Sequence, residues 1–246
     1  MNFLDLKDIS ERFMELINPT TPEKILEIGK IAGMKPGWRI VDFGCGFAEP
    51  LALWGEHLGV SGVGIDIRPY ACQRARQKLA ERGLSERIEI IEGSGSEYQF
   101  EPGNFDAAVC IGASFIWGGV AETLQAMRMA IQPAGKLMVG EPYWVSDSVP
   151  PELAQNQPDF RTELQLLDLA HQQGFDFEYM IRSSLDDWDH YEASNWYGFL
   201  RWIEENPHHP ERQQVIDALH ASQEEYLRFG RKYFGWALFL LNPVKY

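Results

Sequence analysis

The fold of this chain is decided by the stretch RIVDFGCGFAE, which occupies residues 39–49. Its short apolar run predicts a buried strand, and the apolar residues 51–54 that follow predict a helix. Gly44 and Gly46 lie between the two, where a strand, turn and helix together present backbone N–H groups to an anion. Glycine suits this turn because a Cβ atom would block a ligand and restrict φ. The stretch therefore predicts the ligand-binding turn of an α/β domain.

Two cofactor classes use such a turn. Dinucleotide-binding enzymes need G-x-G-x-x-G, and the third glycine position is here Glu49, an acid that would face a pyrophosphate unfavourably. A nucleotide-dependent oxidoreductase is therefore the less favoured alternative. The sequence resembles instead the acid-x-G-x-G-x-G motif of class I S-adenosylmethionine-dependent methyltransferases of the small-molecule type. The residues that carry this resemblance are Asp42, Gly44, Gly46 and, in place of the last glycine, Ala48.

A second short strand is predicted at residues 62–66 and ends in an acid, Asp66. This acid follows Gly44 by 22 residues, close to the offset of about 20 at which an acid reaches a ribose hydroxyl group. Asp42 and Asp66 would then flank a ligand that has an amino group and a free ribose. The alternative role for Asp66 is an N-cap for the helix predicted to begin at Pro69.

Strands and helices continue to alternate along the chain. Strands are predicted at 87–92, 104–113 and 136–140, with helices at 48–58, from 69 onward and at 120–131. This alternation predicts a parallel sheet whose strands have their carboxyl ends at one edge, where ligands bind. The residues expected to converge at that edge are Asp42, Gly44, Asp66, Gly93, Gly112 and Glu141.

The resemblance implies a Rossmann-like sheet of seven strands in the order 3-2-1-4-5-7-6, with strand 7 antiparallel and helices on both faces. We expect one methyltransferase domain over residues 1–246: N-terminal helices in 1–35, a cofactor-binding core at 36–145, and a helical lid insertion at 184–229 before the last strand. The N-terminal helices are predicted at 8–17 and from Pro22, with Thr21 as N-cap. They either pack on the sheet or cover the cofactor.

The resemblance covers residues 36–145 best and implies S-adenosyl-L-methionine as the cofactor. Many relatives carry an acid where this chain has Ser94, so the serine hydroxyl group or the backbone would contact adenine; the alternative is a simple turn of small residues. The residues implied for cofactor binding are Asp42, Gly44, Cys45, Gly46, Asp66, Ile67, Gly93, Ser94, Gly95, Cys110 and Gly112.

Methyl transfer from a sulfonium ion is a direct, in-line displacement that needs a base only when the acceptor must lose a proton. The candidates for catalysis are Glu141, Tyr143 and His190. Glu141 follows a predicted strand beside aromatic residues, where loss of water would raise its pKa. Its alternative role is to hold a turn. A third hypothesis is that the chain binds the cofactor without catalysis, as a scaffold or sensor.

Composition narrows the choice of partners. The chain of 246 residues is 45% hydrophobic and carries a formal net charge of −14. Such a surface repels nucleic acids and anionic membranes, so we expect a small-molecule acceptor that is neutral or cationic rather than anionic. The three cysteines form no C-x-x-C pair, and no metal site is predicted. With no recognisable signal peptide, these features favour the cytoplasm; the oligomeric state stays open.

Overall fold

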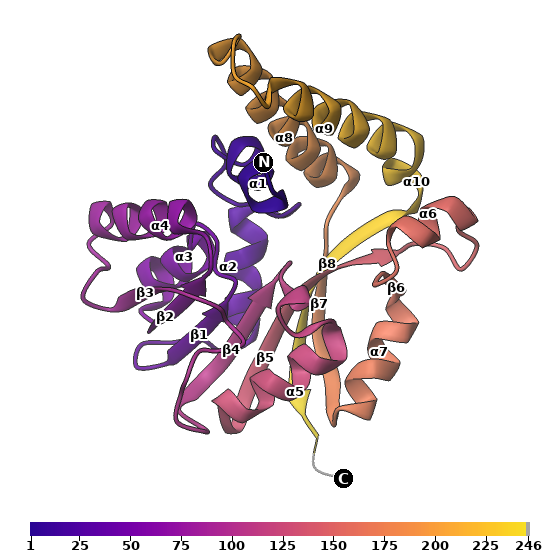
Figure 1. Ribbon diagram of the computed structural model, residues 1–246. Coiled ribbons are helices and arrows are strands. Elements are labelled where there is room, and N and C mark those ends of the chain that lie inside the picture. Colours follow the sequence, from indigo (N-terminus) through magenta and orange to yellow (C-terminus); the bar gives the residue numbers. More distant parts are fainter. Residues whose placement is uncertain (245–246) are drawn as a thin grey trace.

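The computed structural model describes residues 1–244, which fold around one mixed sheet (Figure 1). Across the sheet the strands are β3 (Ile88–Glu92), β2 (Ser61–Asp66), β1 (Arg39–Phe43), β4 (Phe105–Ile111), β5 (Ile131–Trp144), β8 (Phe234–Pro243) and β7 (Phe175–Arg182). β8 runs antiparallel to both of its neighbours, and the other strands are parallel. This arrangement confirms the predicted order. A two-residue strand beside the end of β5, β6 (Arg161–Thr162), is an eighth strand that the prediction lacks.

Helices cover both faces of the sheet (Figure 1). Successive side chains of a strand point to opposite faces, so Ile40 of β1 joins one buried core and Val41 joins the other. The first core packs against α2 (Pro22–Ile31), α3 (Glu49–Leu58) and α4 (Pro69–Glu81). The second packs against α5 (Val120–Ala130) and α7 (Glu163–Gln172). The result is a three-layer α/β/α arrangement.

The first helix begins earlier than predicted. The side chain of Asn2 accepts the N–H group of Asp5 (3.0 Å), and the Asp5 carboxylate accepts the N–H group of Asn2 (2.7 Å). This reciprocal cap starts α1 at Phe3, and the helix ends at Ser10, so the prediction of a helix over 8–17 is wrong. The second helix is as predicted, with Thr21 as its N-cap and Pro22 in its first turn.

The predicted insertion forms a pair of helices, α8 (Leu185–Glu205) and α9 (Arg212–Glu225). A π-helical turn (Tyr226–Gly230) and the short α10 (Arg231–Tyr233) lead from it to β8, while α6 (Pro151–Asn156) lies between β5 and β6. In Figure 1 the pair stands above the sheet with α1 beside α8. A small third core joins α1 to both helices, through Ile9, Phe199, Ile203, Val215 and Leu219.

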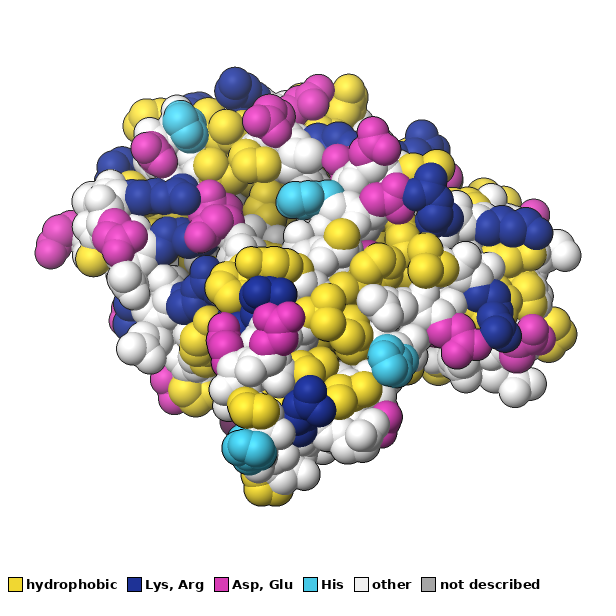
Figure 2. Space-filling model, turned by 90° about the horizontal axis from the view of Figure 1, so that it is seen from above, with side chains coloured by type: hydrophobic (Ala, Val, Ile, Leu, Met, Phe, Trp, Pro, Cys, Tyr) yellow, Lys and Arg dark blue, Asp and Glu magenta, His cyan; other side chains and the backbone are white. Residues whose placement is uncertain are grey.

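The carboxyl ends of the parallel strands thus lie beneath α1 and α8. Seen from above, this face shows hydrophobic side chains in its middle, between charged ones (Figure 2).

Candidate active site

The turn after β1 has the geometry that its glycines predict. The N–H groups of Gly44 and Cys45 both donate to the carbonyl oxygen of Ile65 on β2, at 2.8 and 3.0 Å. Gly44 has a φ of +74°, and a Cβ atom there would lie 2.5 Å from the Cβ atom of Ala113. Ala48 also has a positive φ, of 54°, which is the conformation that the motif's usual glycine adopts freely. The departure at Ala48 therefore leaves the turn intact.

Asp66 holds this turn in place from the end of β2. One carboxylate oxygen accepts the N–H group of Gly46 (2.8 Å), and the other accepts the N–H group of Arg68 (2.9 Å). The Arg68 guanidinium group in turn donates to the carboxylate of Glu11, at 2.7 Å. Because all these side chains are buried, Asp66 links the glycine turn to the segment that follows α1.

A cavity of about 410 Å³ opens at the carboxyl ends of β1, β2 and β4. α1 contributes Phe3 and Lys7 to its wall, and α8 contributes Tyr191, whose hydroxyl group lies 3.3 Å from Lys7 Nζ. Of the two predicted roles for the N-terminal helices, α1 therefore covers the pocket, whereas α2 packs on the sheet. The predicted residues that line this first pocket are Gly44, Asp66, Ile67, Ser94, Gly95 and Gly112.

Asp42 lies beneath the glycine turn with 1% of its surface exposed. Among the residues that the structure describes, no group hydrogen-bonds its Oδ1 atom. Burial, and then the negative charge of Asp66, raises the pKa of Asp42 to about 8. A small hollow lined by Asp42, Gly44, Cys45 and Asn18 adjoins this carboxyl group. An unpaired acceptor beside a glycine turn fits a ligand that carries an amino group.

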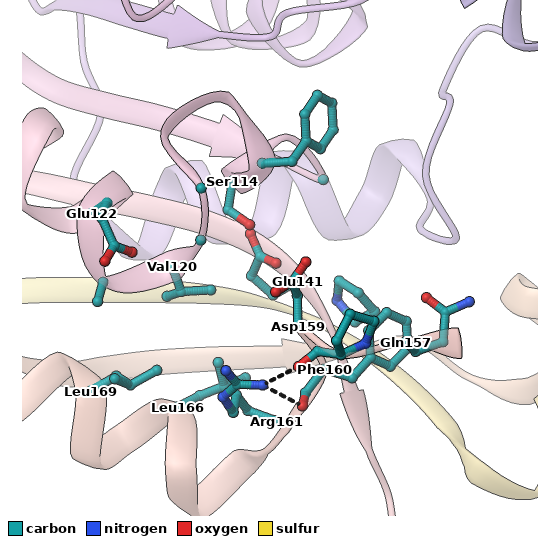
Figure 3. Close-up of a pocket in the computed structure, with 17 residues that line it drawn as sticks. Ser114, Val120, Glu122, Glu141, Gln157, Asp159, Phe160, Arg161, Leu166 and Leu169 are labelled. Atoms are coloured by element: carbon teal, nitrogen blue, oxygen red, sulfur yellow. Dashed lines mark hydrogen bonds between the residues drawn. The ribbon is translucent and has the colours of Figure 1, made fainter. Parts of the chain in front are cut away.

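A second pocket, of about 440 Å³, shares Gly112 and Phe115 with the first (Figure 3). Glu141 of β5 contributes a carboxyl group that is 6% exposed, and its Oε1 atom has no partner in the described chain. Burial raises the pKa of Glu141 to about 8, although the nearby Ser114 side chain opposes this rise. In Figure 3 the labelled residues around Ser114 and Glu141 include Val120, Glu122, Gln157, Asp159, Phe160 and Arg161.

The other predicted residues are not among those that line the two large pockets. Gly46 and Gly93 support the site through backbone hydrogen bonds to Asp66. Burial, and then the charges of Glu141 and Asp42, raises the pKa of the Cys110 thiol, which lies within the sheet. The buried Tyr143 ring packs against Gly235, where a Cβ atom would come within 2.3 Å. His190 is exposed on α8.

Several residues of the first pocket are not among the predicted site residues. They include residues from α1, from the segment after it and from α8: Phe3, Lys7, Glu11, Ile17, Asn18 and Tyr191. The expected cover by the N-terminal helices and the expected lid indicated these regions of the chain without specifying the residues.

Among residues 1–244, no helix has both the length and the apolar character needed to cross a membrane. Nor does this part of the chain bring together three histidine, cysteine or acidic side chains in a way that could hold a metal ion.

The chain matches known proteins along nearly its whole length. Residues 40–135 match the family pattern described as "Methyltransferase domain". The Escherichia coli (strain K12) protein YjhP is 34% identical over 238 residues, which are 95% of this chain and 96% of YjhP. A methyltransferase structure from Thiobacillus denitrificans, with bound S-adenosyl-L-homocysteine, superposes with a TM-score of 0.92 at 30% identity and covers 99% of this chain and 100% of its own.

A second methyltransferase structure with bound S-adenosyl-L-homocysteine, from Geobacter sulfurreducens, also gives a TM-score of 0.92, at 32% identity over 98% of each chain. The likeness thus includes the N-terminal helices and the α8–α9 insertion as well as the sheet. Together with the acid-and-glycine turn described above, these matches confirm the predicted family: the chain belongs to the class I S-adenosylmethionine-dependent methyltransferases.

Proposed function

We propose that this methyltransferase binds S-adenosyl-L-methionine in the first pocket and transfers its methyl group to a small molecule in the second. The observation that carries the proposal is the meeting of the two pockets at Gly112 and Phe115, at the end of β4. A cofactor in one pocket and an acceptor in the other would approach each other there. Direct displacement needs this kind of end-to-end approach, since both reactants must be aligned.

The residues of the first pocket and of the small hollow beside it fit this cofactor. In the hollow, Asp42 has the unpaired oxygen that an amino group requires, and in the first pocket Asp66 and Ile67 line the place where the ribose would lie. Ser94 and Gly95 line the far end, where adenine would lie. A side chain at Gly112 would close the passage, because its Cβ atom would come within 2.4 Å of Asn18 Nδ2. When bound, the cofactor supplies a methyl group on a positively charged sulfur atom.

The chain's own contribution would be alignment and the exclusion of water. α1 covers the first pocket, and Tyr191 reaches it from the lid, so bound reactants would be shielded on the side away from the sheet. Excluding water strengthens the electrostatic contacts inside such a site. We further propose that the acceptor is neutral or cationic, in keeping with the net charge of −14. We also propose that the protein works in the cytoplasm, in keeping with its three unpaired cysteines.

Calorimetry with S-adenosyl-L-homocysteine tests the cofactor site, and we expect a dissociation constant in the micromolar range or tighter. Absence of binding would contradict the proposal. In-line displacement is tested with a chiral methyl group on the cofactor, since one direct transfer inverts its configuration. Retention of configuration would point to two successive transfers.

The two alternatives have their own tests. A nucleotide-dependent oxidoreductase would change NADH fluorescence on binding. Against this alternative, the place of the third glycine is filled by Glu49, a buried carboxylate paired with Lys78 (2.6 Å) and Arg82 (2.9 Å). A non-catalytic scaffold would bind S-adenosyl-L-methionine tightly and yield no S-adenosyl-L-homocysteine with any acceptor.

A further inference from the structure

We propose that the second pocket binds an amine, and that Glu141 holds its amino group and takes its proton, so that the methyl group is transferred to nitrogen. This inference rests on the proposed function and specifies its acceptor class.

Glu141 is a buried acid beside the second pocket. It lies in β5 opposite Ala237 of β8, with only 6% of its surface exposed. Its Oε1 atom lacks a hydrogen-bond donor among the described residues although the pocket lies beside it. The Ser114 side chain hydrogen-bonds this carboxyl group, but Oε1 stays unpaired. Burying an unpaired acceptor costs free energy, and a donor or a positive charge in the pocket relieves that cost. An amino group supplies both.

The wall of the second pocket carries more acidic than basic side chains. Two more acids, Glu122 and Asp159, line it, and Arg161 is the one basic residue in the described lining. Arg161 already donates to the backbone carbonyl oxygens of Pro158 (2.7 Å) and Phe160 (3.0 Å). Three carboxylates against one occupied guanidinium group disfavour an acceptor that carries a carboxylate or phosphate group. They favour one that arrives as an ammonium ion.

Two aromatic side chains, Phe115 and Phe160, line the second pocket. Phe115 lines both pockets, so it lies where the acceptor would meet the cofactor. Phe160 also lines the second pocket, and its ring contacts those of Trp144 and Phe234, with centroids 4.9 and 5.5 Å away. Aromatic faces attract cations and also pack against hydrocarbon. The acceptor is therefore an amine with an apolar body.

The chemistry balances with these groups alone. The Glu141 carboxylate takes one proton from the bound ammonium ion, which frees the nitrogen lone pair. That pair forms the new N–C bond while the bond between methyl carbon and sulfur breaks, and its electrons stay on sulfur. The products are a protonated N-methyl amine, neutral S-adenosyl-L-homocysteine and protonated Glu141. Burial raises the pKa of Glu141 to about 8, so this carboxylate is a stronger base than a glutamate in water.

The experiment uses matched probes that differ only in the polar group. Phenethylamine, 2-phenylethanol and phenylacetate share one skeleton, as do tryptamine, tryptophol and indole-3-acetate. Binding to the full chain loaded with S-adenosyl-L-homocysteine is measured by calorimetry, and methyl transfer by product formation from S-adenosyl-L-methionine. We expect each amine to bind at least about tenfold more tightly than its alcohol or acid, as a charge-assisted hydrogen bond predicts.

The variant Glu141→Gln keeps the shape of the side chain and removes its charge. We expect it to weaken amine binding at least about tenfold, to change alcohol binding by less than about twofold, and to leave S-adenosyl-L-homocysteine binding unchanged. The matched control is Glu89→Gln, the same change at an exposed residue of β3, which should alter none of these values. A melting curve establishes that each variant is folded.

Three results would overturn the inference: tighter binding of an alcohol or acid than of its amine, no binding of any amine to the loaded protein, or unchanged amine binding in Glu141→Gln. The wild-type comparison stands even if that variant does not fold. A chain that binds no S-adenosyl-L-homocysteine instead contradicts the proposed function itself, so the two failures are distinguishable.

Discussion

Replacing Asp42 by asparagine should stabilise the chain without cofactor and weaken its binding of the cofactor. Asp42 is almost completely buried, its Oδ1 atom has no partner in the described residues, and the negative charge of Asp66 lies nearby. The charged form is therefore unfavourable in the folded state. Asparagine has nearly the same shape and no charge, so Asp42→Asn removes the cost of either keeping a proton on this carboxyl group or burying its charge beside Asp66.

The expected magnitude follows from the pKa of Asp42, which rises from 3.8 to about 8 on folding. Between these values the folded chain keeps a proton that the unfolded chain has lost, so this residue lowers stability as pH rises. At pH 7, about 3 pH units above the ordinary pKa, Asp42 lowers the free energy of unfolding by at most about 4 kcal/mol, because each pH unit is worth about 1.4 kcal/mol. Burying the unpaired asparagine amide costs about 1–3 kcal/mol, which leaves a net gain of about 1–3 kcal/mol.

The effect on the cofactor has the opposite sign. If Asp42 holds an amino group, the variant loses one hydrogen bond between charged groups, worth about 1.5–3 kcal/mol. We therefore expect the dissociation constant for S-adenosyl-L-homocysteine to rise about tenfold to a hundredfold.

Urea unfolding at several pH values, with and without S-adenosyl-L-homocysteine, measures both effects. Without ligand, the stability of Asp42→Asn relative to the wild type should grow from about pH 4 to about pH 8 and then level off. With ligand at a fixed concentration, the wild type should gain more stability than the variant. A variant that is less stable than the wild type at pH 8 without ligand, or that binds the ligand equally well, would refute the reasoning.

Three further predictions concern the cover and the passage between the pockets. Arg68→Gln should lower the free energy of unfolding by about 3–5 kcal/mol in urea, because it leaves the buried carboxylates of Asp66 and Glu11 without their shared cation. Gly112→Ala should weaken S-adenosyl-L-homocysteine binding at least about tenfold in calorimetry, since φ is +71° and the new Cβ atom would meet Asn18. Tyr191→Ala should speed release of this ligand about tenfold in stopped-flow measurements, as one wall of the pocket is removed.

The strands could be predicted because their signals are local: each apolar run, and the glycine turn after the first one, spans only a few residues. Asp66 was indicated by its offset of 22 residues from Gly44, and the strand order by the family resemblance, which the observed sheet confirms. The prediction of where α1 begins was wrong, and the reason is also local. The prediction followed apolar spacing, whereas the reciprocal cap between Asn2 and Asp5 fixes where the helix begins.

The cover of the site could not be predicted in the same way. Lys7 and Tyr191 are 184 residues apart, and only the packing of α1 against α8 brings them to one pocket. Glu11 is connected to the site by its hydrogen bond from Arg68. The sequence around Glu11 gives no sign of this buried contact. Glu141 could be predicted, because it follows an apolar run whose carboxyl end must face the ligand edge. The oxygen without a partner is visible only in the folded chain.

The two buried carboxylates divide the ligand edge into two sides. In the sheet, β4 lies between β1 and β5, so Gly112 at the end of β4 separates Asp42 from Glu141. Each carboxyl group has an oxygen without a partner in the described chain, and burial raises the pKa of each to about 8. A chain selected for stability alone would carry neutral side chains at both places, because each charge opposes folding above its ordinary pKa. Under the proposed function, cofactor and acceptor bind on either side of β4, and each relieves the cost of one of these carboxyl groups. The lining residues that the two pockets share, Gly112 and Phe115, are where we propose that the two molecules meet.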